Sequence, residues 1–169
     1  MNEPQLKNIP YAELEIGQSI SRKRVITAED IVQSAALFQD RNPAHLCEEF
    51  AAQSRFGGRI AHGMLGAGLI SGVIGEELPG PGTIYMSQDL QFKAPVMIGD
   101  EITITVSVAE KKDGKREGTG TAKLKTTCVN QNGAVVLDGY ANVLAPSESI
   151  SHALATNHAI PELWSDPEI

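Results

Sequence analysis

"RIAHGMLGAGLISGVIGEEL" (residues 59–78) is apolar on nearly every side, and "LPGPG" (78–82) ends it. A helix that is apolar all round is buried on most of its sides. Each Gly inside a helix costs about 1 kcal/mol relative to Ala, and this stretch contains several. We therefore predict a buried helix over 59–78, with other backbone packed closely against its glycines.

The chain after this helix is typical of β-strands, because apolar and polar residues alternate. The predicted strands cover residues 83–96, 101–111, 121–131 and 134–145. Asn132-Gly133 lies between the last two, and this pair is the strongest short signal for a hairpin turn. Helices followed by antiparallel strands predict an α+β fold. A sheet curled around the central helix would cover it.

The chain before the central helix predicts a strand over 19–26, a helix over 27–40 and a short helix over 47–56. Thr27 and Asp30 resemble a capping box at the start of the longer helix. One apolar face of that helix carries Ile31, Ser34, Ala35 and Phe38. We expect one domain over 1–145, with a loosely ordered lead-in over 1–17. Residues 146–169 form a polar tail, ordered only where Leu163 and Trp164 find a groove.

Composition limits the classes of partner. The 169 residues are 41% hydrophobic and carry a net charge of −7, which argues against binding to nucleic acid or to an anionic membrane. An anionic small ligand needs only local Lys or Arg. We predict that Cys47 and Cys128 are reduced thiols in a cytoplasmic chain. We expect neither a signal peptide nor a membrane-spanning segment.

Asp40 and His45 are the strongest candidates for chemistry. A carboxylate and an imidazole held close can bind one water and divide the work of moving its protons. Asn42 can fix the loop, and Pro43 stiffens the turn between them. The competing interpretation on spacing alone is an ordinary capping loop, since Asp and Asn often hydrogen-bond the backbone at helix ends.

His62 and Gly63 lie where the buried helix is predicted to begin. The first backbone N–H groups of a helix lack partners and carry the positive end of its dipole. The Gly63 N–H could therefore stabilise a negatively charged oxygen. The alternative is a glycine chosen for packing beside a satisfied core histidine. Ser71 could bond a buried polar partner, or bond back to a carbonyl one turn earlier.

Other chemistries find little support in the sequence. It contains no nucleophile elbow, P-loop, C-x-x-C or dinucleotide fingerprint. No cluster of His, Cys and carboxylates suggests a metal site. His152 and His158 lie in the polar tail, and we expect both to be exposed and without a role.

With these residues in hand, the chain resembles the MaoC-like hydratases, specifically (R)-specific enoyl-CoA hydratases of the hydratase-2 type. The resemblance rests on "QDRNPAHL" (39–46), which matches the family motif D-x-N-P-x-H. It is reinforced by "RIAHGML" (59–65) and "ELPGPGTIYMSQDLQFKAPVMIGDEIT" (77–103), and covers roughly residues 15 to 145.

The resemblance implies a hot-dog fold, a homodimer or dimer-based oligomer, and reversible hydration of a trans-2-enoyl-CoA to an (R)-3-hydroxyacyl-CoA. It implies that Asp40 and His45 activate the water, that Asn42 supports them, and that the Gly63 N–H binds the thioester oxygen. Ser71 would belong to the surrounding polar shell. No metal or redox cofactor is expected, because CoA arrives with the substrate. The basic residues nearest the motifs, together with His62, are candidates for substrate binding: Arg55, Arg59 and Lys93.

Two further interpretations stay open. One is another hot-dog enzyme, either a dehydratase acting on acyl-carrier-protein substrates or a thioesterase. The other is a non-catalytic acyl-CoA-binding protein, for which an intact Asp40/His45 pair would have no use. Acyl chain length, the carrier, the pathway and the roles of Asp40 and His45 as base and acid are not fixed by the sequence.

Overall fold

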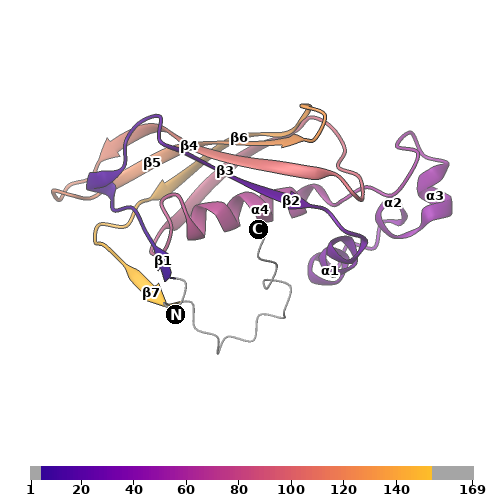
Figure 1. The fold of residues 1–169 in the computed structure, drawn as a ribbon, viewed down its shortest axis with the longest axis horizontal. Helices are drawn as coiled ribbons and strands as arrows, with labels where there is room; N and C mark the ends of the chain where they lie inside the picture. The colour runs from indigo at the N-terminus through magenta and orange to yellow at the C-terminus, as the bar shows by residue number, and fades with distance from the viewer. Residues whose placement is uncertain (1–4, 154–169) are drawn as a thin grey trace.

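The computed structural model describes residues 5–153, and its centre is a helix beneath a curved sheet (Figure 1). The helix is α4 (Gly63–Glu76). The five antiparallel strands have the order β2-β4-β5-β6-β3. Their bounds are Ser19–Val25 for β2, Ile84–Phe92 for β3, Glu101–Asp113 for β4, Gly120–Asn130 for β5 and Val135–Leu144 for β6. The predicted α+β arrangement, a sheet curled around a long helix, is confirmed.

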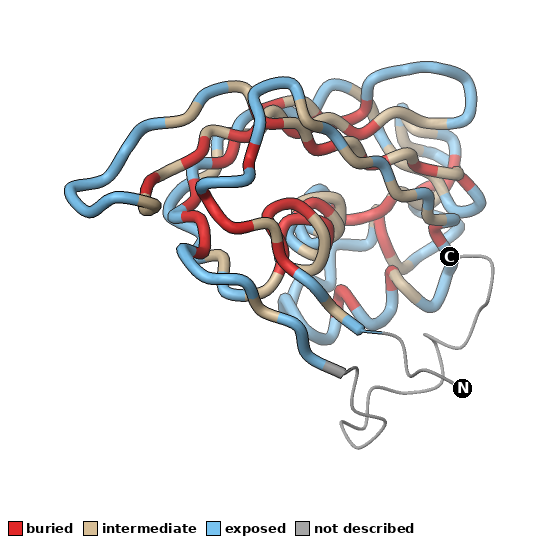
Figure 2. Tube along the Cα trace, turned by 60° about the vertical axis from the view of Figure 1, so that its left-hand side comes forward, coloured by how far each residue is buried: buried red, intermediate tan, exposed pale blue. Residues whose placement is uncertain are grey.

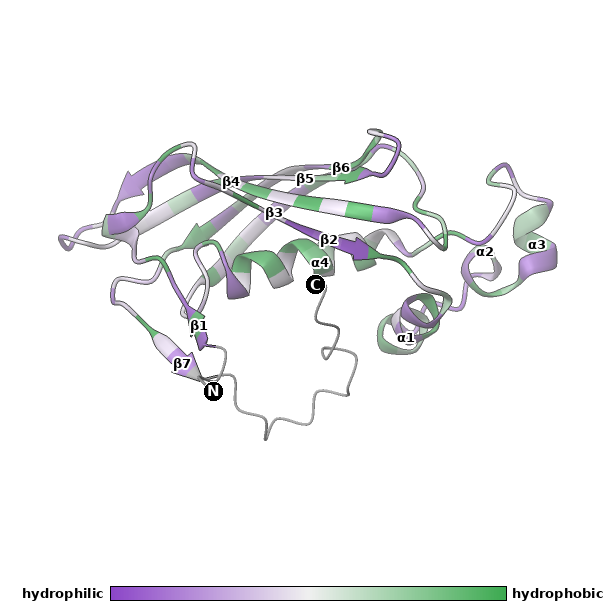
Figure 3. Ribbon diagram, viewed as in Figure 1, coloured by the Kyte–Doolittle hydropathy of each residue, from purple (hydrophilic) through white to green (hydrophobic). Residues whose placement is uncertain are grey.

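One side of α4 makes the core. Ile70, Val73 and Ile74 are fully buried against apolar side chains of the sheet, as the hydropathy along the strands also indicates (Figures 2 and 3). The opposite side is open, since Met64 and Ser71 are exposed. The prediction of burial on most sides was therefore wrong for the outer face.

The glycines of α4 accommodate side chains rather than backbone, contrary to the sequence-based prediction. A Cβ on Gly63 would lie 2.7 Å from the Phe92 ring, and one on Gly66 would lie 3.0 Å from Leu137 Cδ1. At Gly68 and Gly75 nothing lies within 4 Å of such an atom. Two of the glycines are thus required by packing, and two have open space.

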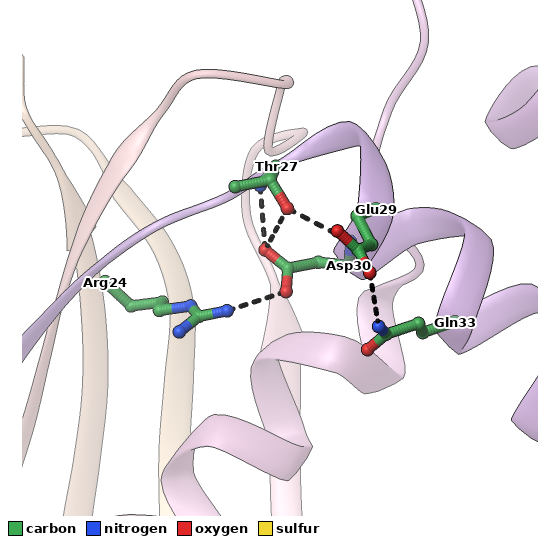
Figure 4. A network of polar contacts seen from close by, with 5 residues as sticks. All are labelled: Arg24, Thr27, Glu29, Asp30 and Gln33. Atoms are coloured by element: carbon green, nitrogen blue, oxygen red, sulfur yellow. Dashed lines mark hydrogen bonds and ion pairs between the residues drawn. The ribbon is translucent and has the colours of Figure 1, made fainter. Parts of the chain in front are cut away.

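Helix α1 (Ala28–Phe38) begins at the predicted capping box, which is confirmed (Figure 4). The Asp30 backbone N–H donates to Thr27 Oγ1 at 3.1 Å, and the Thr27 N–H donates to Asp30 Oδ2 at 2.8 Å. Arg24 donates to the other carboxylate oxygen at 2.7 Å. This network fixes the start of α1 against β2. The position of Asp40, which lies just past the other end of α1, therefore depends on it.

The connection from α1 to α4 holds two short helices at the end of the sheet near α1 (Figure 1). Helix α3 (Glu48–Ala52) falls within the predicted 47–56, whereas the single turn α2 (Pro43–Leu46) was not predicted. Residues 59–62 are not helical, contrary to prediction. Ile60 instead bridges to Met97, and the Ala61 N–H donates to the Val96 carbonyl at 2.8 Å.

The lead-in is more ordered than predicted, because it packs on the fold. It contains a short strand, β1 (Gln5–Lys7), and a 3-10 turn, η1 (Tyr11–Glu13), and it buries Tyr11 and Leu14. The Tyr11 hydroxyl donates to Asp113 Oδ1 at 2.7 Å.

Part of the predicted tail also belongs to the folded protein. β7 (Ser151–Ala153) pairs with β1 in a separate two-stranded sheet. His152 is exposed, as predicted. His158, Leu163 and Trp164 lie outside the described residues.

Two further predictions concern reduced cysteines and the absence of a membrane-spanning segment. Cys47 and Cys128 are both free thiols, as expected. Within residues 5–153, each helix is too short or too polar to cross a membrane.

Candidate active site

The loop after α1 presents the Asp40 carboxylate. Gln39 ends the helix in the left-handed conformation, with φ of 56°, and turns the chain sharply. Asp40 Oδ1 then accepts the backbone N–H of Asn42 at 3.0 Å. Its side chain is 50% exposed, so this carboxylate stays in contact with water.

His45 is positioned by the short helix α2. Asn42 caps this helix by accepting the Ala44 N–H at 3.0 Å, and Pro43 occupies its first position. The buried His45 ring donates Nδ1–H to the Ile60 carbonyl at 2.8 Å, since a carbonyl only accepts. Its Nε2 faces Asp40 Oδ2 at 4.0 Å. That distance is too long for a direct hydrogen bond and leaves room for one bridging water.

His62 lies against both members of this pair. Its ring stacks on His45 with centroids 3.8 Å apart, and its Nε2–H donates to the Asp40 backbone carbonyl at 3.1 Å. Phe38 meets the ring edge-on at 5.8 Å. His62 was a candidate for substrate binding; its contacts here are with the two catalytic candidates.

Gly63 is the first residue of α4, which agrees with the helix start proposed at His62-Gly63 but not with the wider predicted range of 59–78. Its N–H therefore belongs to the unpartnered first turn at the positive end of the helix dipole. The Phe92 ring packs where a side chain would be, so only Gly fits without displacing that ring. Gly63 directly follows His62, whose ring contacts both Asp40 and His45, so the start of α4 adjoins this pair.

A cavity of about 350 Å³ lies between α4 and the sheet, and it is lined by His45 and Gly63 but not by Asp40. His45, His62 and Gly63 line its polar end. The rest of its wall is mostly apolar, and includes Ile26, Leu69, Ile102, Cys128, Val136 and Leu137. A cavity with a few polar groups at one end and an apolar body is typical of a site for a small amphipathic ligand.

Of the basic residues predicted to bind substrate, some line the cavity and one does not. Arg55 and Lys93 line the cavity and can meet an anionic ligand there. The Arg59 Nε lies 3.6 Å from Glu48 Oε2 and does not line the cavity.

Ser71 is not brought near the Asp40/His45 pair. It is exposed and lines a second, shallower hollow of about 1030 Å³ on the outer face of α4. Phe38, Met64, Tyr85 and Leu90 line the same hollow. Neither expected bond, to a buried partner or to a carbonyl one turn earlier, is among the contacts of Ser71 in the described part of the chain.

Cys128 takes no part as a nucleophile. Burial raises the pKa of its thiol to about 12, so it stays protonated at neutral pH. It contributes an uncharged, apolar surface to the cavity wall.

The sequence did not foresee that Asp40, His45 and His62 would form one cluster. Their potential metal-ligand atoms lie within 4.8 Å of one another. The stacking of the two rings opposes shared coordination, because ring lone pairs lie in the ring plane and an ion in one plane would lie out of the other.

Two other groups that shape the site were also not predicted from the sequence. The Ile60 carbonyl is a backbone group without a side-chain signature, and Phe92 lies about 30 residues from the Gly63 it covers. The Asn42-Pro43 step could have revealed α2, since Asn at the N-cap followed by Pro is a helix-start signal.

Comparisons with known proteins place the chain among similar sequences and structures. The family model described as "MaoC like domain" matches residues 12–130. A 3-hydroxybutyryl-CoA dehydratase of Methylorubrum extorquens is 45% identical over 152 residues, covering 90% of this chain and 94% of the relative. An (R)-specific enoyl-CoA hydratase of Rhodospirillum rubrum is 46% identical over 137 residues, 81% of this chain and 92% of the relative.

Solved structures agree with the sequence relatives. The R-hydratase of Pseudomonas aeruginosa in its unliganded form superposes with a TM-score of 0.84 and 44% identity, covering 90% of this chain and 95% of that one. The curved sheet around α4 is therefore the hot-dog fold. The chain belongs to the MaoC-like family, and it is a hydro-lyase, an enzyme that adds water to a carbon–carbon double bond or removes it.

Proposed function

We propose that the protein is an (R)-specific enoyl-CoA hydratase, which interconverts a trans-2-enoyl-CoA and an (R)-3-hydroxyacyl-CoA. The observation that carries this proposal is the Asp40/His45 pair, 4.0 Å apart, whose His45 lines a cavity together with Gly63, the first residue of α4. A water activator, a donor for a developing oxyanion and an apolar compartment thus adjoin one another.

Asp40 and His45 hold and split the water. The charged form of His45 keeps its Nδ1–H on the Ile60 carbonyl and donates Nε2–H to the water oxygen, while the water donates to Asp40 Oδ2. Asp40 removes the water proton as the oxygen adds to Cβ, and His45 supplies the proton that Cα gains. Asp40 is in contact with solvent, so the pair can reset its protons there.

The Gly63 N–H binds the thioester oxygen. Negative charge moves onto that oxygen when water adds to Cβ, and a donor already aimed at it lowers the barrier. The acyl chain then extends into the apolar cavity, and the CoA phosphates meet Arg55 and Lys93. Every group in this step is a residue of this chain or part of the substrate.

The decisive experiment follows crotonyl-CoA by its enoyl absorbance, with wild type, Asp40→Asn and His45→Gln. The expected result is hydration by wild type and a loss of about 10²-fold or more in each variant, which is typical for removing a general acid or base. Gly75→Ala is the control and should keep the wild-type rate, because nothing lies within 4 Å of its new Cβ and Gly75 lines neither hollow.

Other outcomes would point to the other functions. Release of CoA with the enoyl group intact would identify a thioesterase. Activity on a 3-hydroxyacyl carrier protein but not on the CoA ester would identify an acyl-carrier-protein dehydratase. Binding of crotonyl-CoA without turnover would identify a non-catalytic binder. Full activity in both variants would exclude the Asp40/His45 pair from the chemistry.

We also propose that two copies of the chain form a homodimer through β3. This strand is last in the sheet order, so one of its edges is unpaired within residues 5–153. Exposed apolar side chains lie on it and beside it, namely Ile84, Met86, Phe92 and Met64. A second β3 related by two-fold symmetry would pair that edge and cover the outer hollow, which removes an aggregation-prone strand edge.

A further inference from the structure

We propose that His62 is a positioning residue that keeps Asp40 and His45 in register with the Gly63 N–H, an inference that rests on the proposed hydratase function. Its ring contacts both members of the pair, and its own backbone continues directly into Gly63. Among the described residues it therefore links all three catalytic candidates.

The hydrogen bond from His62 restrains the loop that carries Asp40. Asp40 follows the left-handed Gln39, and its side chain is half exposed. The 3.1 Å bond from His62 Nε2 to its carbonyl ties the loop to a residue 22 positions later, at the start of α4. A shift of this loop would change the 4.0 Å gap in which the water is held.

The hydrogen-bond partners of the His62 ring indicate which of its nitrogens carries the hydrogen. Nε2 carries a hydrogen because the Asp40 carbonyl only accepts. Nδ1 is buried without a hydrogen-bond partner in the described part of the chain, and the residue is only 4% exposed. A second hydrogen there would be a buried donor without an acceptor, which is costly.

Two substitutions of His62 separate the contribution of its hydrogen bond from the contribution of its ring. His62→Gln keeps an N–H donor at about the distance of Nε2 but removes the ring. His62→Phe keeps a flat ring against His45 and Phe38 but removes the donor. A positioning role through Asp40 requires the donor, so His62→Gln should retain most of the activity that His62→Phe loses.

The test measures crotonyl-CoA hydration by wild type, both variants and Asp40→Asn, with thermal unfolding to confirm that each folds. We expect His62→Phe to lower kcat about tenfold with KM changed less than twofold, since small misplacements of reacting groups act on the chemical step. We expect His62→Gln to stay within about threefold of wild type.

Combining His62→Phe with Asp40→Asn distinguishes a role of His62 through Asp40 from a merely structural role. If His62 acts through Asp40, adding His62→Phe to Asp40→Asn should lower the residual rate by less than about twofold. A full tenfold loss in that background, a loss confined to KM, or equal losses in His62→Phe and His62→Gln would each overturn the inference. A wild type that does not hydrate crotonyl-CoA would instead overturn the proposed function.

Discussion

The two hollows on either side of α4 share part of their walls and differ in chemistry. Leu65, Leu69 and Phe92 line both. The inner cavity of about 350 Å³ ends at two stacked histidines and the start of the helix. The outer hollow of about 1030 Å³ has Ser71, Tyr85 and Gln88 along an apolar face beside a strand edge.

The comparison of the two hollows shows which features make the inner cavity suitable for catalysis. Volume does not decide it, because the larger hollow lacks the carboxylate–imidazole pair and the helix start. The inner cavity has polar groups that converge at one end, whereas the outer hollow presents a broad apolar surface suited to a second copy of the chain. The following predictions test that distinction, beginning with the largest expected effect.

Gly63→Ala should lower kcat for crotonyl-CoA hydration by about 10²-fold, as expected when an oxyanion donor is disturbed. The new Cβ would lie 2.7 Å from the Phe92 ring, so the ring and the helix start must move. Gly75→Ala in the same helix is the matched control, because nothing lies within 4 Å of its new Cβ. Equal kinetics in the two variants would show that the Gly63 N–H takes no part.

Gly68→Arg should convert the proposed homodimer into a monomer, measured by sedimentation velocity. Gly68 lines the outer hollow and has open space around it, so a long cation fits one copy but opposes burial against another. Gly75→Arg is the control, since Gly75 is also unobstructed but does not line that hollow. A Gly68→Arg protein that still dimerises would place the interface elsewhere.

Cys128→Met should lower kcat/KM for octenoyl-CoA about tenfold relative to crotonyl-CoA, because the longer side chain reduces the inner cavity. Cys128→Ala enlarges the cavity and should not penalise the longer substrate. The measurement is the ratio of the two kcat/KM values in each variant. An unchanged ratio in Cys128→Met would mean that the acyl chain does not extend to this wall.

Asp30→Asn should lower the free energy of unfolding by about 1 kcal/mol at pH 7, since it weakens the capping network (Figure 4). Burial raises the pKa of Asp30, but hydrogen bonds from Thr27 and Arg24 outweigh burial and hold the pKa below 3.8. A lowered folded-state pKa stabilises the protein above the unfolded value, and that contribution is lost as the pH falls through the folded pKa.

The difference between Asp30→Asn and wild type should therefore shrink in urea unfolding below pH 3.8. Glu29→Gln, in the exposed Glu29–Gln33 pair, is the control and should change stability little at either pH. A gap between Asp30→Asn and wild type that is equal at pH 7 and in acid would contradict this account.

Local patterns in the sequence were sufficient for several features. The capping box at Thr27, the alternation in the strands and the hairpin at Asn132-Gly133 depend on neighbours a few residues apart. Asp40 and His45 were also identified as candidates, because a five-residue spacing across a turn with Asn42 and Pro43 allows their side chains to approach one another.

Only the tertiary structure decided the features that join distant segments. His62 stacks on His45, Phe92 covers Gly63, and β1 pairs with β7 across nearly the whole chain. The tertiary structure also places Ser71 on the outer face of α4. The position of a residue in a helix does not by itself reveal which side of that helix a sheet will cover. Local hydrogen bonding and periodicity are written in short stretches of sequence, whereas contacts between segments depend on how the sheet curves and where each loop returns.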